Sequence, residues 1–305
     1  MKKISVIIPT YNGSKCIKRL ISSIQNQTGL GGDFDLEIIV VDDCSQDKTA
    51  EIAKSFSVKV LSTRENTGGP NAGRNIGLRA ATGDYICLVD QDDEWATTKI
   101  QKQLKLMEKV PICFTEFYIQ DDNSGRSDLY GTGSADFEFF EENETFLKTL
   151  ARKKHRHRYE TPYLGSLMFD KQLTVLHFEE FFGKLDFDWL LRLFRDQRTA
   201  KVSEPLVIRH VDGSNLSLDL KYRRLDYFYA RMIYEQYEDD FPKEVKAAIK
   251  GLNGTRARYY YKMNNMRKAR EYFFQSKMNW KTILYIITTF AGSDFVKKHF
   301  RVFGT

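Results

Sequence analysis

The first hundred residues alternate short apolar runs, rich in β-branched residues, with segments of helical periodicity. This alternation of expected strands and helices is typical of a mostly parallel β-sheet that helices cover on both faces. The runs are almost continuously apolar, which fits strands buried on both faces. The expected strands span 4–9, 36–41, 58–62 and 84–89, and the expected helices span 15–27, 47–55, 70–81 and 96–109.

Beyond residue 110 the alternation becomes less regular. Weaker elements follow: a strand at 113–119, helices near 143–152 and 186–195, a basic loop at 152–158 and a strand at 201–210. Residues 219–305 show no strand alternation and look helical. We therefore expect a first domain over 1–217, with halves 1–110 and 111–217, and a helical, basic region over 218–305.

The composition is that of a globular protein, with 42% hydrophobic and 29% charged residues. The four cysteines lack CxxC spacing, so we expect neither a zinc cluster nor a disulfide framework, and a reduced, cytoplasmic location. The apolar run near the N-terminus ends at Pro9, which is short for a signal peptide. The longest apolar run, at 283–291, is well below the about 20 residues that cross a bilayer.

The net charge of +6 is distributed unevenly. Residues 243–305 contain 14 Lys and Arg against three acids, so this part carries +11 and the rest of the chain −5. Basic residues interleaved with Tyr, Phe and Trp are typical of helices on an anionic membrane surface. Packing of the apolar residues onto the first domain is the alternative. No nucleic-acid-binding motif accompanies the basic residues, so we expect no nucleic-acid partner.

The expected strands end in polar or glycine-rich segments, which read PTYNG, DDCSQD, TRENTGG and DQDDEW. In open α/β sheets ligands bind outside the carboxyl ends of the strands. The last segment places Asp90, Asp92 and Asp93 directly after a buried strand. One or two carboxylates, together with phosphate oxygens, are a common ligand set for a hard divalent cation. The segment therefore predicts a site for a metal ion and a diphosphate, with a solvated acidic turn as the alternative.

Four segments in order, ISVIIPTYN, VVDDCSQDKT, NTGGPNAGRNIG and GDYICLVDQDDEW, together resemble the family 2 glycosyltransferases, inverting enzymes of the GT-A fold. The resemblance covers roughly residues 1–110 and continues more weakly to about 217. It implies a Rossmann-like, mostly parallel mixed sheet flanked by helices, here with a C-terminal helical extension. It also implies a hexosyltransferase-like enzyme that uses a nucleotide diphosphate sugar, expected to be a UDP-sugar, and Mg²⁺ or Mn²⁺.

In this resemblance Asp90 and Asp92 match the family's DxD motif. Either Asp92 or Asp93 is then the direct metal ligand, and the other contacts the ribose. Tyr11, next to Pro9 in the first segment, matches a position that binds the nucleoside, where an aromatic ring can stack on the base.

Asp43 also matches a nucleoside-binding position, as an acceptor for the N–H of the base. Capping of the following helix is the alternative for this acidic segment. Gly69 and Arg74 match the segment that faces the diphosphate, where backbone at a helix start can approach phosphate closely. An ordinary Gly-Pro entry into a helix is the alternative there.

The segment LDFDWLLRL at 185–193 resembles the family's ED-x-D-L-W-L-R-L, which carries the catalytic base. The resemblance places Asp186 at the base position and Asp188 at the following acid. Leu185 stands where the family has Glu, which leaves open which of the two aspartates acts. An Asp at a helix start also caps the helix and complements its dipole.

VIRHVDGSNLS at 207–217 resembles the family's closing YR-x-H segment, whose histidine lies by the metal and the diphosphate. His210 takes that place, although it follows Arg209 without the usual intervening residue. A structural histidine is the alternative.

The sequence thus predicts a metal-dependent inverting glycosyltransferase that acts on a saccharide or lipid-linked saccharide in bacterial surface polysaccharide synthesis. We expect it in the cytoplasm, peripheral on the inner face of the cell membrane. Neither membrane spans nor a QxxRW segment of the processive synthases is found, which favours single additions. A non-catalytic nucleotide-sugar-binding relative and a nucleotidyltransferase are the alternatives, although the opening IIPTYNG is not a nucleotidyltransferase glycine loop.

Overall fold

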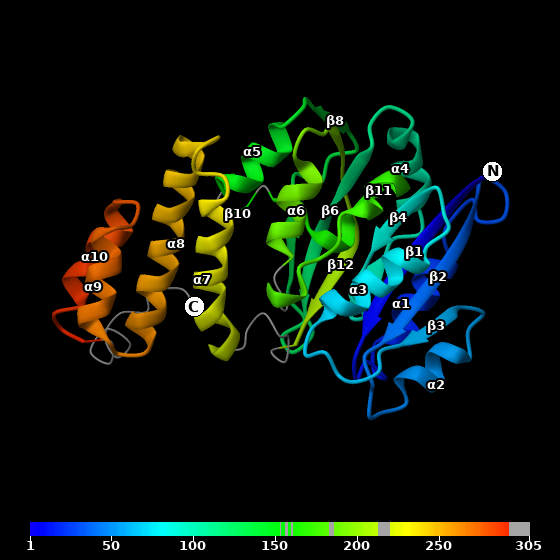
Figure 1. Cartoon of the computed structure of the whole chain (residues 1–305), viewed down its shortest axis with the longest axis horizontal. Helices are drawn as coiled ribbons and strands as arrows, with labels where there is room; N and C mark the ends of the chain where they lie inside the picture. The colour runs from blue at the N-terminus through cyan, green and yellow to red at the C-terminus, as the bar shows by residue number, and fades with distance from the viewer. Residues whose placement is uncertain (153, 156–157, 160, 183–185, 213–219, 293–305) are drawn as a thin grey trace. The chain divides into compact units, whose positions relative to one another are not determined.

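The computed structural model describes residues 1–152, 154–155, 158–159, 161–182, 186–212 and 220–292 (Figure 1). The chain forms two compact units, one of residues 1–149 and 154–219 and the other of residues 150–153 and 220–305. The expected boundary at residue 217 lies outside the described residues, and the division of function that it marks stays a prediction.

The expected α/β architecture of the first unit is confirmed. Each strand and helix expected in the first 110 residues is present, with ends shifted by at most three residues. The elements of this part are β1 (Lys2–Thr10), α1 (Ile17–Gln25), β2 (Phe34–Asp42), α2 (Thr49–Lys54), β3 (Lys59–Ser62), α3 (Pro70–Ala80), β4 (Tyr85–Leu88), β5 (Glu94–Trp95) and α4 (Lys99–Met107).

The later part of this unit is built from shorter elements around two long strands. They are β6 (Ile112–Asp121), β7 (Ser127–Tyr130), β8 (Phe137–Phe140), α5 (Glu144–Leu150), β9 (Lys154–His155), β10 (Arg158–Tyr159), η1 (Leu164–Ser166), β11 (Met168–Asp170), η2 (Lys171–Val175), η3 (Glu180–Phe182), α6 (Phe187–Phe194) and β12 (Thr199–Val211). The basic run expected as a loop thus contributes the short antiparallel pair β9–β10.

The strand order in the main sheet is β3-β2-β1-β4-β11-β6-β12-β5, with β7 beside β6 and β8 beside β12. Strands β1 to β4 are parallel, and β11 runs antiparallel to both β4 and β6. From β1 the chain first adds β2 and β3 on one side and then β4 on the other. The strand order therefore reverses between β1 and β4, the place where ligands bind in open α/β sheets.

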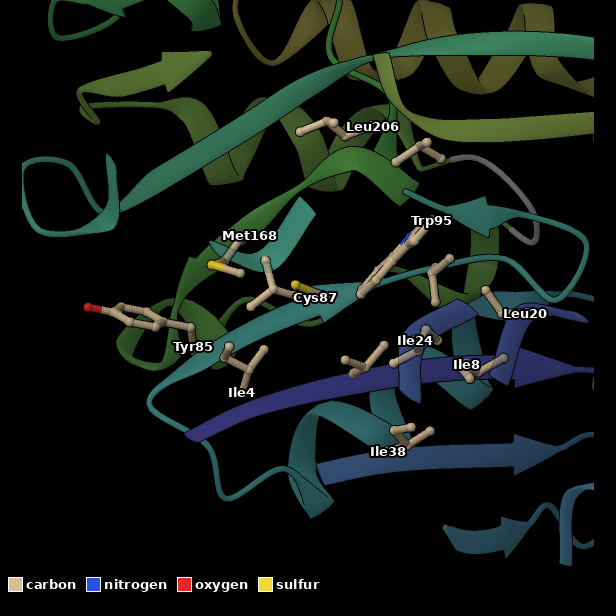
Figure 2. Packing of buried hydrophobic residues seen from close by; sticks show 14 of the residues in the cluster. Ile4, Ile8, Leu20, Ile24, Ile38, Tyr85, Cys87, Trp95, Met168 and Leu206 are labelled. Carbon is tan, nitrogen blue, oxygen red and sulfur yellow. The ribbon is translucent and has the colours of Figure 1, made fainter. Parts of the chain in front are cut away.

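Side chains of β1 alternate between two covered faces. Ile4 and Ile8 belong to a buried cluster that also includes Leu20 and Ile24 of α1 (Figure 2). On the opposite face α3 lies close to the strand, since a Cβ added at Gly77 would lie 2.2 Å from the Ile7 side chain. Only glycine leaves room for this approach, so the glycines of the NAGRNIG segment have a packing role.

The start of α6 is held by aromatic packing. Trp189 stacks on Phe178, with ring centroids 4.4 Å apart, and meets Phe169 of β11 edge to face at 5.5 Å. Its indole N–H donates to the carbonyl of Leu176 at 2.7 Å. The first turn of α6 is therefore fixed against the sheet although the chain before it is irregular.

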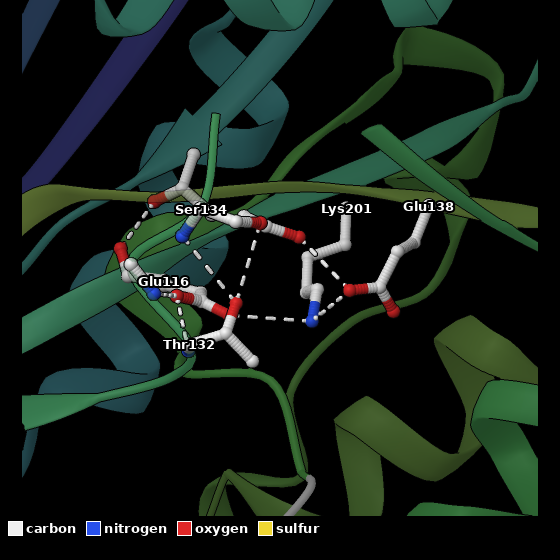
Figure 3. A network of polar contacts seen from close by, with 8 residues as sticks. Glu116, Thr132, Ser134, Glu138 and Lys201 are labelled. Atoms are coloured by element: carbon white, nitrogen blue, oxygen red, sulfur yellow. Dashed lines mark hydrogen bonds and ion pairs between the residues drawn. The ribbon is translucent and has the colours of Figure 1, made fainter. Parts of the chain in front are cut away.

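A buried carboxylate organises the loop after β7 (Figure 3). Glu116 of β6 accepts hydrogen bonds from the backbone N–H groups of Thr132 and Gly133, at 2.7 and 2.8 Å. Lys201 of β12 lies 3.3 Å from Glu116 and 2.7 Å from Glu138 of β8. This network joins β6, β8 and β12 and supplies the charge pairing that a buried carboxylate needs.

The second unit is helical, as expected for the C-terminal extension. Its helices are α7 (Leu220–Glu235), α8 (Pro242–Lys262), α9 (Met266–Phe274) and α10 (Trp280–Thr288). A small core of Ala257, Tyr261, Ala269 and Phe273 joins α8 to α9. Within the described parts of the chain, no helix combines the length and the apolar character needed to span a membrane.

Candidate functional site

The carboxyl ends of β1 and β4 are tied together by Gln91, the middle residue of the Asp-x-Asp segment. Its side-chain oxygen accepts the N–H of Tyr11 at 2.9 Å, and its amide nitrogen donates to the Tyr11 carbonyl at 3.1 Å. A Cβ at Gly13 would lie 2.3 Å from the same oxygen. The sequence reasoning missed Gln91, because neither its residue type nor its spacing signals a bridge between strand ends.

Of the two residues expected near the nucleoside in the first segment, only Tyr11 presents its side chain to solvent. Tyr11 is 43% exposed, so a ring face is available to a flat base. Pro9 lies within β1 and packs beneath α3, since a Cβ at Gly73 would be 3.2 Å from its Cβ. The structure thus gives Pro9 a packing role, and a contact of Pro9 with a nucleoside stays a prediction.

Asp43, expected to contact the base, holds the following loop. Its carboxylate accepts the N–H of Thr67 at 3.0 Å and the hydroxyl of Thr63 at 2.9 Å. The neighbouring Asp42 accepts the N–H of Ser45 at 3.1 Å, ahead of α2, so it forms a turn and does not cap the helix as the alternative had it. The structure thus gives Asp43 a role in holding this loop, and a contact of Asp43 with a base stays a prediction.

Arg74 and Asp90 form a partly buried ion pair, with a guanidinium nitrogen 2.7 Å from a carboxylate oxygen. Arg74 is buried and is held by Asn71 at 3.1 Å and by the ring of Phe178 at 5.2 Å. Gly69 precedes α3 in extended conformation and accepts the hydroxyl of Thr67 through its carbonyl at 3.1 Å. Arg74 therefore links α3 to the acidic segment after β4.

The other two acids of the segment have raised pKa values. Burial, and then the neighbouring Asp90, raise the pKa of Asp92 to about 6. Burial and the nearby Asp90 and Asp92 hold the pKa of Asp93 well above its usual range, and the Tyr163 hydroxyl donates to its carboxylate at 2.7 Å. Carboxylates that repel one another in a water-poor site are the setting that a cation relieves.

Asp90 and Asp92 fit a hard divalent cation, which prefers oxygen ligands. Among the residues that the structure describes, no group of three or more His, Cys, Asp or Glu side chains could hold a metal ion on its own. A Mg²⁺-type site typically has one or two carboxylates and takes its remaining ligands from water and phosphate. The pair therefore fits an ion that enters together with a diphosphate, whereas Asp93 is fully buried against Tyr163.

Two residues that the sequence reasoning did not select, Arg209 and Tyr163, complete the charge balance. The Arg209 guanidinium lies 5.2 Å from the Tyr163 ring. Burial alone would lower the pKa of Arg209, but Tyr163, Asp90 and Asp93 raise it above its ordinary value. Arg209 directly precedes His210 in the segment that resembles the family's closing segment. This position was the signal from which Arg209 could have been selected.

Asp186 lies directly before α6, near enough to Arg74, Asp90 and Arg209 for their charges to act on its pKa. Burial raises its pKa, while the nearby Arg74 and Arg209 act to lower it. Its side chain makes no capping hydrogen bond to α6. The capping alternative for Asp186 therefore has no support, and Asp186 joins Asp90 at the site. Leu185 lies outside the described residues.

Asp188 forms an ion pair within α6. Its carboxylate receives two nitrogens of Arg192, at 2.7 and 2.8 Å, within one helical turn. Arg192 also donates to the carbonyl of His177 at 2.8 Å. This buried pair fixes α6 to the preceding segment, so Asp188 has a structural role.

His210, expected near the metal, lies on β12 with two acidic neighbours. Its Nδ1 is 2.7 Å from Asp122, and its Nε2 is 3.6 Å from Glu94. These contacts join β12 to β5 and to the residue directly after β6. A contact of His210 with a metal stays a prediction. The end of the matched segment, 213–217, lies outside the described residues.

The family model described as glycosyl transferase family 2 matches residues 5–168. Poly(ribitol-phosphate) beta-N-acetylglucosaminyltransferase TarS of Staphylococcus aureus is 41% identical over 97 residues, 30% of this chain and 17% of that protein. GalNAc(5)-diNAcBac-PP-undecaprenol beta-1,3-glucosyltransferase of Campylobacter jejuni is 30% identical over 190 residues, 60% of this chain and 57% of that protein. The chain therefore spans less than two thirds of the length of either relative.

Two solved structures resemble the whole chain. Residues 1–349 of S. aureus TarS in complex with UDP-GlcNAc superpose with a TM-score of 0.59 at 17% identity, over 97% of this chain and 91% of that one. Mannosyltransferase PcManGT from Pyrobaculum calidifontis, in complex with GDP-Man and Mn²⁺, gives a TM-score of 0.57 at 15% identity, over 95% and 80%. The expected GT-A fold is thereby confirmed.

Proposed function

The chain belongs to glycosyl transferase family 2, and we propose that it is a metal-dependent inverting glycosyltransferase. It would transfer a sugar from a UDP-sugar to a saccharide hydroxyl during synthesis of a bacterial surface polysaccharide. The observation that carries this proposal is the Arg74–Asp90 ion pair after β4, beside the reversal of strand order, with Asp186 and Arg209 near enough for their charges to act on one another. A base, an anchor for a metal and fixed positive charge are what such a transfer needs.

The donor would lie across the carboxyl ends of β1 and β4. Exposure of Tyr11 supports stacking on the base, and Asp43, directly after β2, would contact the base N–H. A relative in the same fold is bound to UDP-GlcNAc, which supports a uridine nucleotide. Gly69, directly before α3, would bring backbone close to the diphosphate.

Asp90 and Asp92 would hold Mg²⁺ or Mn²⁺, with Asp93 and His210 as outer groups. A bound ion would neutralise the charge that grows on the departing diphosphate. Arg74 keeps the Asp90 carboxylate in place through its ion pair. Arg209, from β12, adds a second fixed positive charge near the acids.

Asp186 would act as the general base. In a single displacement the acceptor oxygen loses its proton to the Asp186 carboxylate, forms the new bond to the anomeric carbon and displaces the nucleotide diphosphate from the opposite face. A base is most effective when its pKa is near the working pH, and burial moves the pKa of Asp186 in that direction. The ion pair of Asp188 with Arg192 supports Asp186, and not Asp188, in this role.

The acceptor would be a saccharide, free or carried on a lipid diphosphate. The name of the Campylobacter relative includes an undecaprenol diphosphate carrier, which supports a lipid-linked acceptor here. Such a substrate would bring the enzyme to the inner face of the cell membrane, as the basic C-terminal region suggested.

The direct test uses a panel of nucleotide sugars, with and without Mn²⁺, in thermal-shift and hydrolysis assays. Donor binding should raise the melting temperature, most with a uridine nucleotide and Mn²⁺, because a ligand stabilises the state that it binds. Release of UDP that is lost on Asp92→Asn would exclude a non-catalytic relative. Release of pyrophosphate from a nucleoside triphosphate and a sugar 1-phosphate would instead indicate a nucleotidyltransferase. No stabilisation by any nucleotide sugar would contradict the proposal.

A further inference from the structure

Helix α10 has apolar side chains on both of its sides. On its inner side Tyr285 stacks on Phe273 of α9, with ring centroids 5.2 Å apart, and Thr289 is buried. On its outer side Trp280, Ile283 and Ile287 are exposed by 63%, 47% and 60%. Their spacing of three and four residues places them on one face of the helix. We call this set, with Leu284, the outer face of α10.

The apolar surface continues beyond the helix. Phe274 at the end of α9 and Met278 in the following turn are also exposed, and Phe290 directly after α10 is exposed by 75%. Soluble monomers rarely expose so many large apolar side chains within a short segment, and an exposed apolar patch commonly marks an interaction site. The polar residues that normally form the outer side of a surface helix are absent from this face.

The charges around this surface are almost all positive. Residues 266–292 contain five Lys and Arg against the single acid Glu271, which lies 3.4 Å from Arg267. Lys277 and Lys281, both exposed, flank the start of α10. Two copies of this chain would bring like charges together, which disfavours self-association through this face. A partner with an anionic surface and an apolar interior matches both the positive charge and the exposed apolar side chains.

A tryptophan at the border of such a face fits the same partner. The indole ring has an apolar body and one N–H donor, and Trp is enriched at the level of lipid headgroups. Lysine stems can extend along apolar surface while their charged ends reach phosphate. With nine residues α10 is too short to cross a bilayer, so in a membrane it would lie in the interface.

We propose that the outer face of α10 inserts into the surface of an anionic lipid bilayer, with Lys277 and Lys281 at the headgroups. This inference goes beyond glycosyl transfer, because binding of the protein to vesicles needs neither donor nor acceptor. It identifies one helix within the basic C-terminal region as the docking element.

The test measures binding of the full chain to vesicles of phosphatidylcholine with and without phosphatidylglycerol, by flotation. Binding should require the anionic lipid. Brominated lipid chains should quench the fluorescence of Trp280, while Trp95 and Trp189 are buried and should contribute little to the quenching. Unquenched fluorescence on bound protein would overturn the proposal, because it would leave α10 outside the lipid.

Ile283→Ser combined with Ile287→Ser should weaken vesicle binding by at least about tenfold, because both side chains lose their burial in lipid. The single change Ile287→Ser has a matched control in Val175→Ser, which removes a side chain 76% exposed on the first unit and should leave binding unchanged. Unchanged melting curves would show that the variants are folded.

Lys277→Gln with Lys281→Gln should weaken binding by roughly fivefold for each charge removed, and high salt should act in the same direction. Vesicle binding that is insensitive to the isoleucine variants would overturn the proposal. So would a dimer in light scattering that Ile287→Ser dissociates, with no binding to vesicles, since the face would then be a protein interface.

Discussion

The two halves of the main sheet position their site residues by different means. In the half built from β1 to β4, regular parallel strands end at one edge, and Tyr11 and Asp90 follow from that geometry. In the half built around β6 and β12, Asp186 is placed by the packing of Trp189 and by the ion pair of Asp188. Backbone regularity thus fixes the proposed donor side, whereas buried side chains fix the proposed base.

Removal of the proposed base gives the largest expected effect. Asp186→Asn should lower the rate of transfer by about a hundredfold to ten-thousandfold, the usual contribution of general base catalysis, and leave donor affinity within a few fold. Steady-state transfer and donor titration measure the two quantities.

Asp188→Asn is the matched control two residues away. It should lower the free energy of unfolding by about 1–3 kcal/mol, because Arg192 loses a charged partner, and keep most of the turnover of the folded protein. If Asp188→Asn abolished turnover while Asp186→Asn did not, the assignment of the base would be reversed.

A pair of core substitutions compares the two halves directly. Trp189→Ala should destabilise the protein by about 3–5 kcal/mol, because it leaves a cavity between Phe169 and Phe178. Gly77→Ala in the regular half should cost about 1–3 kcal/mol through overpacking against Ile7. Urea unfolding measures both, and a larger loss from Gly77→Ala would contradict the view that aromatic packing dominates the second half.

Loss of a stacking partner should weaken donor binding more modestly. Tyr11→Ala should raise the donor dissociation constant by the equivalent of about 1–3 kcal/mol, whereas Tyr11→Phe should change it little, since stacking needs only the ring. Isothermal titration with UDP measures the change. Equal affinities for all three proteins would remove Tyr11 from the donor site.

The stability of the folded protein should depend on pH through Asp92, and the sign of this dependence follows from its pKa. Because burial and Asp90 raise the pKa of Asp92 to about 6, the folded protein holds a proton that the unfolded chain releases at lower pH. The stabilising effect of this proton is present at low pH and is lost as the pH rises through about 6.

A cation competes with the same proton, so Mn²⁺ affinity should fall up to about tenfold per pH unit below 6. Asp92→Asn should weaken Mn²⁺ binding, abolish its pH dependence and raise the melting temperature of the metal-free protein near pH 7.5. The exposed Asp35→Asn is the control for a change of net charge, and it should alter none of the three.

Sequence reasoning succeeded where local signals decide the structure. The alternating strands and helices predicted the fold of the first 110 residues. The acids after β4 predicted a cluster of charged side chains at the carboxyl ends of the strands. Gln91, Tyr163 and Arg209 were missed, because their contacts join strands far apart in the sequence. The distinction between Asp186 and Asp188 needed the structure, since it depends on which carboxylate an arginine pairs with.

The most direct measurement is a crystal structure of the protein with UDP and Mn²⁺. The account predicts the nucleotide across the ends of β1 and β4, with the ion bound by a carboxylate oxygen of Asp90 or Asp92 and by the diphosphate, and Asp186 open toward the sugar side. A nucleotide bound elsewhere, with both carboxylates turned away from the ion, would contradict it.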